Sequence, residues 1–203
     1  MGQPDAVREL LARLRGFAVD PADVAARLDG MSHAERVEAI RSLGRAEQRR
    51  LYEAVDGFAS LRLLDLVPAG VGELVTVRHF GRNTLPLFTH FEKRFCRPRG
   101  EDPEKPSALY GFNHQSLSRL TGPGCFVARN DETRPEVLID YREVPPERPG
   151  GWPEIRSNER GLARLVYGGM VDTLRRVSEH VSIGSAARGG RDLGSWFVLC
   201  REA

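Results

Sequence analysis

The chain has 203 residues, of which 40% are hydrophobic and 29% are charged, and its 30 Lys and Arg against 28 Asp and Glu leave a formal net charge of +2. This composition is ordinary for a globular protein and offers no concentrated basic surface for a nucleic acid. No apolar run approaches the roughly 18 residues that would span a bilayer, so we expect no membrane span.

The cysteines and the N-terminus predict the compartment. Cys96, Cys125 and Cys200 are odd in number and widely spaced, and the chain has no CxxC pair. Such cysteines are typical of buried, reduced thiols in a cytosolic protein. The first residues lack the basic and then apolar pattern of a signal peptide. We therefore expect a soluble, cytoplasmic protein.

The first 57 residues predict an array of short helices. Apolar residues recur at helical spacing over residues 7–14, and an Asp-Pro pair at 20–21 supplies an N-cap and a first-turn proline for a second helix. Ser32 with Glu35 forms a capping-box pattern that opens a third helix. A fourth helix is expected over residues 45–55.

A weak repeat of 12 residues runs through this helical segment. Its equivalent positions are Ala22, Ala34 and Ala46, then Leu28, Ile40 and Tyr52, then Met31, Leu43 and Val55. The array resembles the short-helix repeats at the N-terminus of magnesium-transporter cytosolic domains, and this likeness implies helices that stack on one another. The segment is interpreted either as a cap on its own β domain or as an interaction element.

From about residue 58 the pattern favours strands separated by glycine-rich turns. Strands or short buried pieces are expected over 61–67 and 74–79, and strands over 108–114, 125–129, 137–142, 162–170, 173–177, 179–186 and 195–201. Residues 84–95 are ambiguous, and a short helix is expected there because their apolar side chains share a helical face. The predicted fold class is α+β: a helical N-terminal segment, 1–57, followed by an antiparallel β-barrel-like domain, 58–203.

The closing strands are similar to those of a lipocalin-like (calycin) family of small β-barrels. The likeness lies in Leu165-Val166-Tyr167, Asp172-Thr173-Leu174-Arg175-Arg176-Val177, Val181-Ser182-Ile183-Gly184-Ser185-Ala186 and Trp196-Phe197-Val198-Leu199. The GxWxG motif of that family does not occur in this chain. The resemblance implies a barrel with an internal cavity suited to a small, partly apolar ligand.

Five residues are candidates for binding that ligand. Tyr110, Phe112 and His114 share one face of a predicted strand, and an inward face of this kind could line a pocket. The alternative is a core aromatic pair with a histidine bonded to a backbone carbonyl. Tyr141 belongs to the same predicted cavity, and His180 lies on a polar strand face that points either to the lumen or to solvent.

Three functions remain open from the sequence. The first is non-enzymatic binding of a small hydrophobic or amphipathic molecule. The second is a protein-protein interaction module, which allows a homodimer and uses the helical array with the apolar segment Leu85–Phe95. The third is an enzyme with His114 or His180 as general acid/base. The histidines show no HxH or HExxH spacing, so we expect neither a metal nor a cofactor.

Overall fold

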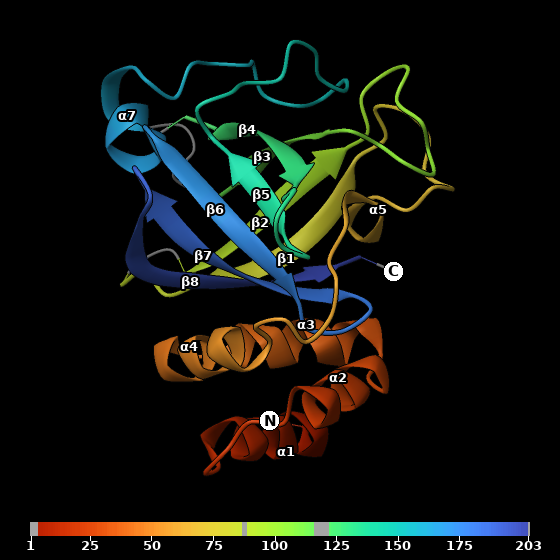
Figure 1. The fold of residues 1–203 in the computed structure, drawn as a ribbon, viewed down its shortest axis with the longest axis vertical. Coiled ribbons are helices and arrows are strands. Elements are labelled where there is room, and N and C mark those ends of the chain that lie inside the picture. The colour runs from red at the N-terminus through yellow and green to blue at the C-terminus, as the bar shows by residue number, and fades with distance from the viewer. Residues whose placement is uncertain (1–3, 87–88, 116–121, 203) are drawn as a thin grey trace.

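The protein combines short N-terminal helices with a closed eight-stranded barrel (Figure 1). The structure is a computed structural model and describes residues 4–86, 89–115 and 122–202. All eight strands are antiparallel, each paired with the next along the chain, and β8 pairs back with β1. The predicted α+β class is therefore confirmed. Closure satisfies the backbone groups of the first and last strands, which would otherwise be exposed edges.

The four predicted N-terminal helices form as expected. They are α1 (Asp5–Arg15), α2 (Pro21–Asp29), α3 (His33–Ser42) and α4 (Arg45–Ala54). The side chain of Asp20 accepts a hydrogen bond from the backbone N of Ala22 at 2.9 Å and so caps α2. Ser32 and Glu35 form the predicted capping box of α3. These helix starts can be predicted from nearby residues, because each cap satisfies backbone donors that the helix cannot satisfy itself.

The capping box gives a first prediction. We expect Ser32→Ala to lower the free energy of unfolding by about 1 kcal/mol, because the backbone N of Glu35 loses its acceptor. The backbone N of Ser32 keeps its 2.9 Å bond to the Glu35 carboxylate. Urea unfolding of this variant and of Ser60→Ala, at an exposed loop serine, measures the difference. Equal losses in both variants would contradict the capping role.

Two buried polar side chains occupy one position of the 12-residue repeat. Arg36 donates from Nε to the carbonyl of Leu28 at 3.0 Å, and Gln48 donates from Nε2 to the carbonyl of Leu43 at 2.9 Å. Each bond satisfies a carbonyl near the C-terminal end of the preceding helix. The repeat therefore joins successive helices by hydrogen bonds as well as by apolar packing.

The helices cover the outer faces of three strands, as Figure 1 shows below the barrel. Contacts run from α3 to β1 and β8 and from α4 to β7 and β8. One apolar core contains helix residues such as Leu28 and Ile40 together with Val181, Ile183 and Val198 of the barrel wall. The helical segment is thus a cap on the barrel, and residues 181–186 of β7 and 197–200 of β8 are buried on both faces.

The strand bounds confirm most of the predicted strands. They are β1 (Val77–Asn83), β2 (His90–Cys96), β3 (Leu109–His114), β4 (Cys125–Asn130), β5 (Val137–Asp140), β6 (Met170–Arg176), β7 (Val181–Arg188) and β8 (Arg191–Arg201). Two predictions were wrong. The short helix expected over 84–95 is absent from its described residues, where 90–96 form β2, and residues 87–88 lie outside the described ones. The strand expected over 162–170 is instead the helix α7 (Gly161–Tyr167) followed by the start of β6.

One end of the barrel is closed by residues 61–67, here called the plug, which include the short helix α5 (Leu63–Leu66). Leu63 and Leu66 belong to the apolar core inside the barrel. Nε2 of the buried His79, on the inner face of β1, lies 3.0 Å from the carbonyl oxygen of Leu66. Burial lowers the pKa of His79 to about 3, so the imidazole is neutral and Nε2–H donates to this carbonyl. Because the plug closes this end of the barrel, the entrance to the lumen lies at the opposite end.

Candidate ligand site in the barrel lumen

The lumen has a filled half and a hollow half. Next to the plug, Phe95, Phe126, Ile139 and Leu174 are completely buried and pack together. Toward the other end lies a cavity of about 370 Å³. Its lining is Asn83, Leu85, Phe91, Lys93, Asn113, Gln115, Tyr141, Leu165, Val166, Tyr167, Met170, Asp172, Ala186, Arg188, Leu193, Ser195, Trp196 and Phe197. This volume is in the lower part of the range of small-molecule pockets.

Four polar side chains from four parts of the wall meet in the cavity, and we call Lys93, Asn113, Tyr141 and Asp172 the polar cluster. Nζ of Lys93 donates to Oδ1 of Asn113 at 3.0 Å and to the hydroxyl of Tyr141, and lies 3.4 Å from Oδ2 of Asp172. The hydroxyl of Tyr141 donates to the same Asp172 oxygen at 3.2 Å and accepts from Nδ2 of Asn113 at 3.0 Å. All four side chains are buried.

Aromatic rings surround the lysine nitrogen. Nζ of Lys93 lies 4.7 Å from the ring centroid of Phe197, 5.0 Å from that of Tyr141, 5.1 Å from that of Phe126 and 5.9 Å from that of Phe91. Ring faces attract a cation at these distances, most strongly where water is excluded. The rings and Asp172 therefore replace part of the hydration that a buried ammonium loses.

Three glycines of the barrel wall make room for these rings. Gly81 is the cross-strand partner of Phe91, Gly111 of Phe126, and Gly184 of Phe197. A Cβ at Gly184 would lie 2.3 Å from the ring of Phe197, and one at Gly111 would lie 2.2 Å from the ring of Phe126. Each ring leans over the bare backbone of the glycine opposite, and this packing directs it inward.

Burial governs the ionisation of the cluster. Burial lowers the pKa of Lys93, while the Asp172 carboxylate acts in the opposite direction. Burial likewise raises the pKa of Asp172, opposed by Lys93 and Tyr141. The pKa of Tyr141 is raised well above its ordinary value, first by burial and then by the Asp172 charge. Among the described residues, Oδ1 of Asp172 has no hydrogen-bond partner, so it is an open acceptor for a ligand donor.

The helix α7 lies across the open end and forms one side of the entrance (Figure 1). The ring of Tyr167, its last residue, stacks on Tyr141 with 5.3 Å between centroids and 17° between planes. Nη2 of Arg188 donates to the carbonyls of Leu165 and Val166, at 3.0 and 3.1 Å, near the C-terminal end of α7. Leu165 is 71% exposed, so the rim of the entrance is partly apolar.

A buried asparagine fixes the chain that leads into α7. Nδ2 of Asn158 donates to the carbonyl of Cys125 at 2.6 Å and to that of Tyr141 at 2.8 Å. These carbonyls belong to the entrance ends of two neighbouring wall segments. Asn158 thereby holds residues 154–160 against the barrel and places α7 over the cavity.

The structure places the five predicted site residues in three regions. Tyr141 lines the cavity, whereas Tyr110, Phe112 and His114 lie on the outer face of β3, because Asn113 between them points inward. The inward orientation expected for these three residues is therefore corrected. The ring of Phe112 packs 4.7 Å from that of Trp152, in the proline-rich loop that covers this outer face. His114 is exposed.

His180 lies in the turn between β6 and β7, at the plug end of the barrel and away from the cavity. Burial and the neighbouring Arg201 lower its pKa. Asp172 pairs with Lys93 across the lumen and not with either of the arginines three and four residues further along its own strand. Arg175 instead pairs with Glu136, and Arg176 with Asp65.

Sequence reasoning missed Lys93, Asn113 and Asp172. The signal for Lys93 was present: in an alternating strand it lies on the same face as Phe91 and Phe95, and a lysine between two inward phenylalanines needs a partner. The helix assigned to residues 84–95 concealed it. Asp172 carried no comparable signal, since arginines lie three and four residues further along the chain.

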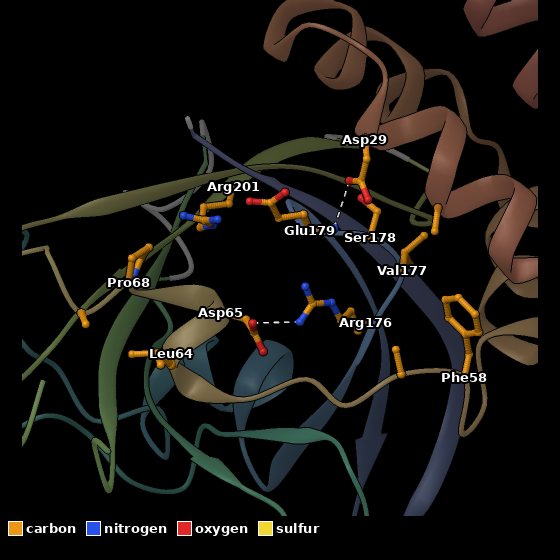
Figure 2. Close-up of a pocket in the computed structure, with 13 residues that line it drawn as sticks. Asp29, Phe58, Leu64, Asp65, Pro68, Arg176, Val177, Ser178, Glu179 and Arg201 are labelled. Atoms are coloured by element: carbon orange, nitrogen blue, oxygen red, sulfur yellow. Dashed lines mark hydrogen bonds and ion pairs between the residues drawn. The ribbon is translucent and has the colours of Figure 1, made fainter. Parts of the chain in front are cut away.

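A larger groove, of about 720 Å³, lies outside the barrel between the end of α2, residues 58–69 and the turn before β7 (Figure 2). Figure 2 shows Asp65 and Arg176 facing each other, with 2.9 Å between Oδ1 and Nη1. Asp29 accepts a hydrogen bond from the backbone N of Glu179 at 3.0 Å. Asp65, Arg176 and Asp29 thus already have partners, whereas the lumen holds four buried polar side chains beside an apolar cavity, so we take the lumen as the candidate site.

No protein-family model matches the chain, and no curated protein or solved structure is significantly similar to it. The fold and the cavity therefore define the class by themselves: an α+β protein with a closed, capped, eight-stranded antiparallel barrel. Within the described ranges, no group of three or more His, Cys, Asp or Glu could hold a metal ion. In the same ranges, no helix is long and apolar enough to cross a membrane.

Proposed function

We propose that this protein binds a small, partly apolar molecule in the lumen of its barrel and is not an enzyme that turns it over. The observation that carries the proposal is a cavity of about 370 Å³ with apolar walls and a buried polar cluster. Ligand pockets commonly combine apolar walls with a few convergent polar groups that orient the ligand. A molecule with a polar head and an apolar body matches this arrangement.

The cluster also limits the chemistry of the head group. The ammonium of Lys93 is a donor, and the unpartnered Oδ1 of Asp172 is an acceptor. The two charges compensate each other, so the site favours a neutral head with an oxygen that accepts a hydrogen bond. An up-and-down barrel holding such a ligand is the arrangement of lipocalins, and we propose a lipocalin-like mode of binding.

The other two functions find less support in the site. None of the described residues that line the cavity is a histidine, so the expected imidazole acid or base has no place there. Of the described residues in the segment Leu85–Phe95, Phe91 and Phe95 point into the barrel and are therefore not available to a protein partner. The apolar sides of the helices are used on the barrel wall.

Filling the cavity tests the proposal. Ala186 lines the cavity, whereas the next residue, Ala187, has its side chain on the opposite face of β7. We expect Ala186→Phe to weaken binding of the neutral fluorescent amphiphile N-phenyl-1-naphthylamine at least about tenfold, or about 1.4 kcal/mol. Ala187→Phe serves as the matched control and should leave the affinity unchanged.

Native mass spectrometry of freshly purified protein provides a second readout that needs no variant. We expect a fraction of the protein to carry a small bound molecule that is lost on denaturation. The proposal fails if the purified protein is always empty and the probe binds both alanine variants and the natural chain equally.

A further inference from the structure

The amine in the lumen is unusual for this chain. Of the 30 Lys and Arg residues only Lys93 and Lys105 are lysines, and Lys105 lies exposed in the loop between β2 and β3. Everywhere else the chain uses arginine for positive charge, and an arginine stays protonated under all physiological conditions. Lys93, the cation of the polar cluster, is of the type that can lose its proton and become a nucleophile.

We propose that Lys93 forms a reversible imine with the carbonyl carbon of an aldehyde ligand bound in the cavity. This inference rests on the proposed function, since the aldehyde must first occupy the lumen. It makes the ligand class specific: a small aldehyde whose apolar body lies among the rings and whose carbonyl group meets Nζ of Lys93.

Geometry places a proton acceptor beside the amine. Oδ2 of Asp172 lies 3.4 Å from Nζ of Lys93 and takes a proton from the ammonium to give a neutral amine and a carboxylic acid. Burial lowers the pKa of Lys93 and raises that of Asp172, and both directions favour this transfer. Both side chains are only 2% exposed, and this burial strengthens the interaction between them.

The remaining steps of imine formation use the same two groups, and their atoms and charges balance. The amine lone pair forms a C–N bond as the carbonyl π bond breaks, and a nitrogen proton moves to the oxygen to give a carbinolamine. Asp172 then returns its proton to the carbinolamine hydroxyl, the C–O bond breaks, and water leaves. The product is a protonated imine with Asp172 again a carboxylate, so the net change is ammonium plus aldehyde to iminium plus water.

The site suits the product as well as the free amine. The iminium keeps the positive charge of Lys93 next to Asp172 and the rings of Phe126, Tyr141 and Phe197. The hydroxyl of Tyr141, now within hydrogen-bond distance of both Nζ and Asp172, can donate to the departing oxygen. Since no charge is created or lost overall, the lumen needs no extra counter-ion.

Reductive trapping tests the imine. The full chain is mixed with octanal and sodium cyanoborohydride at neutral pH, and the alkylated residue is located by peptide mass spectrometry. We expect Lys93 to be labelled at least about tenfold faster than Lys105, despite its burial, because Asp172 beside it can take the proton that blocks the amine. In the Lys105→Arg variant, Lys93 should be labelled at the same rate as in the natural chain.

The variant Lys93→Met/Asp172→Leu removes the amine and its buried counter-ion together and serves as a folded control, verified by near-ultraviolet circular dichroism. It should lose the fast label. Labelling of Lys105 or the N-terminal amine as fast as Lys93 would overturn the imine.

A parallel measurement separates the two proposals. Octan-1-ol has the same apolar body and no carbonyl group, and its displacement of the fluorescent amphiphile reports occupation of the lumen alone. Displacement by octan-1-ol without a Lys93 adduct from octanal would overturn the imine and leave the lumen as a binding site. Failure of both compounds to displace the probe would count against binding in the lumen itself.

Discussion

Replacement of Lys93 by methionine is expected to lower the free energy of unfolding at pH 7 by about 3–5 kcal/mol, because it leaves the carboxylate of Asp172 buried without a counter-charge. Methionine fills most of the volume of the lysine, so the loss of packing is small. A loss of this size is a large fraction of the stability of an ordinary domain. Urea unfolding at pH 7 measures it.

The deficit of Lys93→Met should shrink as the pH falls. Burial without the lysine raises the pKa of Asp172 further in the folded state, so the folded protein holds a proton that the unfolded chain releases. Between the unfolded pKa, about 3.9, and the raised folded pKa, stability therefore decreases with rising pH. The variant should recover part of its loss between pH 7 and about pH 5.

The double variant Lys93→Met/Asp172→Leu separates buried charge from packing. Replacing both members of a buried ion pair by apolar residues is often neutral or stabilising. We expect the double variant to be at least as stable as the natural chain, although it loses the ligand-orienting groups. If it is as unstable as the single variant, the effect of Lys93 is packing and the charge argument is wrong.

Addition of a single methyl group at Gly111 is expected to cost about 3 kcal/mol. Its Cβ would lie 2.2 Å from the ring of Phe126 and 2.8 Å from the backbone oxygen of Arg94, and the backbone cannot move away without disturbing β2. Overpacking of this kind typically costs about 1–3 kcal/mol, and a backbone contact places it at the upper end. Thermal or urea unfolding of Gly111→Ala measures the loss.

The control for Gly111→Ala is Gly150→Ala, in a loop where a Cβ would meet nothing within 4 Å. That change should be neutral or slightly stabilising, since alanine restricts the unfolded chain. The pair Gly111→Ala/Phe126→Leu adds a specific check. Removing the ring frees the space, so the double loss should be smaller than the sum of the single losses. Additive losses would show that the ring does not cause the cost.

The helical segment could be predicted closely because its signals are local. Asp20 and Ser32 mark two helix starts by the bonds they make within three residues. The strand β2 could not be predicted in this way, since Phe91 and Phe95 are four residues apart and fit both a helical face and an alternating strand. Only pairing with β1 and β3 decides between them.

The outer surface of the barrel explains why the candidate site was largely misplaced. Aromatic residues on β3 were expected to face inward, since an outward face is usually polar. Here Trp152, some forty residues later, packs over Phe112, so the outer face is apolar as well. The helices have the same effect on β7, where the outward Val181 and Ile183 are buried and the inward Ser182 is polar. Whether a distant segment covers the outer face of a strand cannot be recognised from the sequence of that strand alone.

Closure of the barrel by β1 and β8 also determines when the cavity comes into being. Contacts between segments so distant in sequence form slowly, because the chain must first give up the entropy of a long loop. Until β8 is in place, Phe197 does not cover Lys93, and the ammonium stays hydrated. A ligand present during folding can enter through this open seam and be enclosed as the wall closes. For the binding function proposed above, the seam between β1 and β8 is thus a second route into the lumen besides the entrance beside α7.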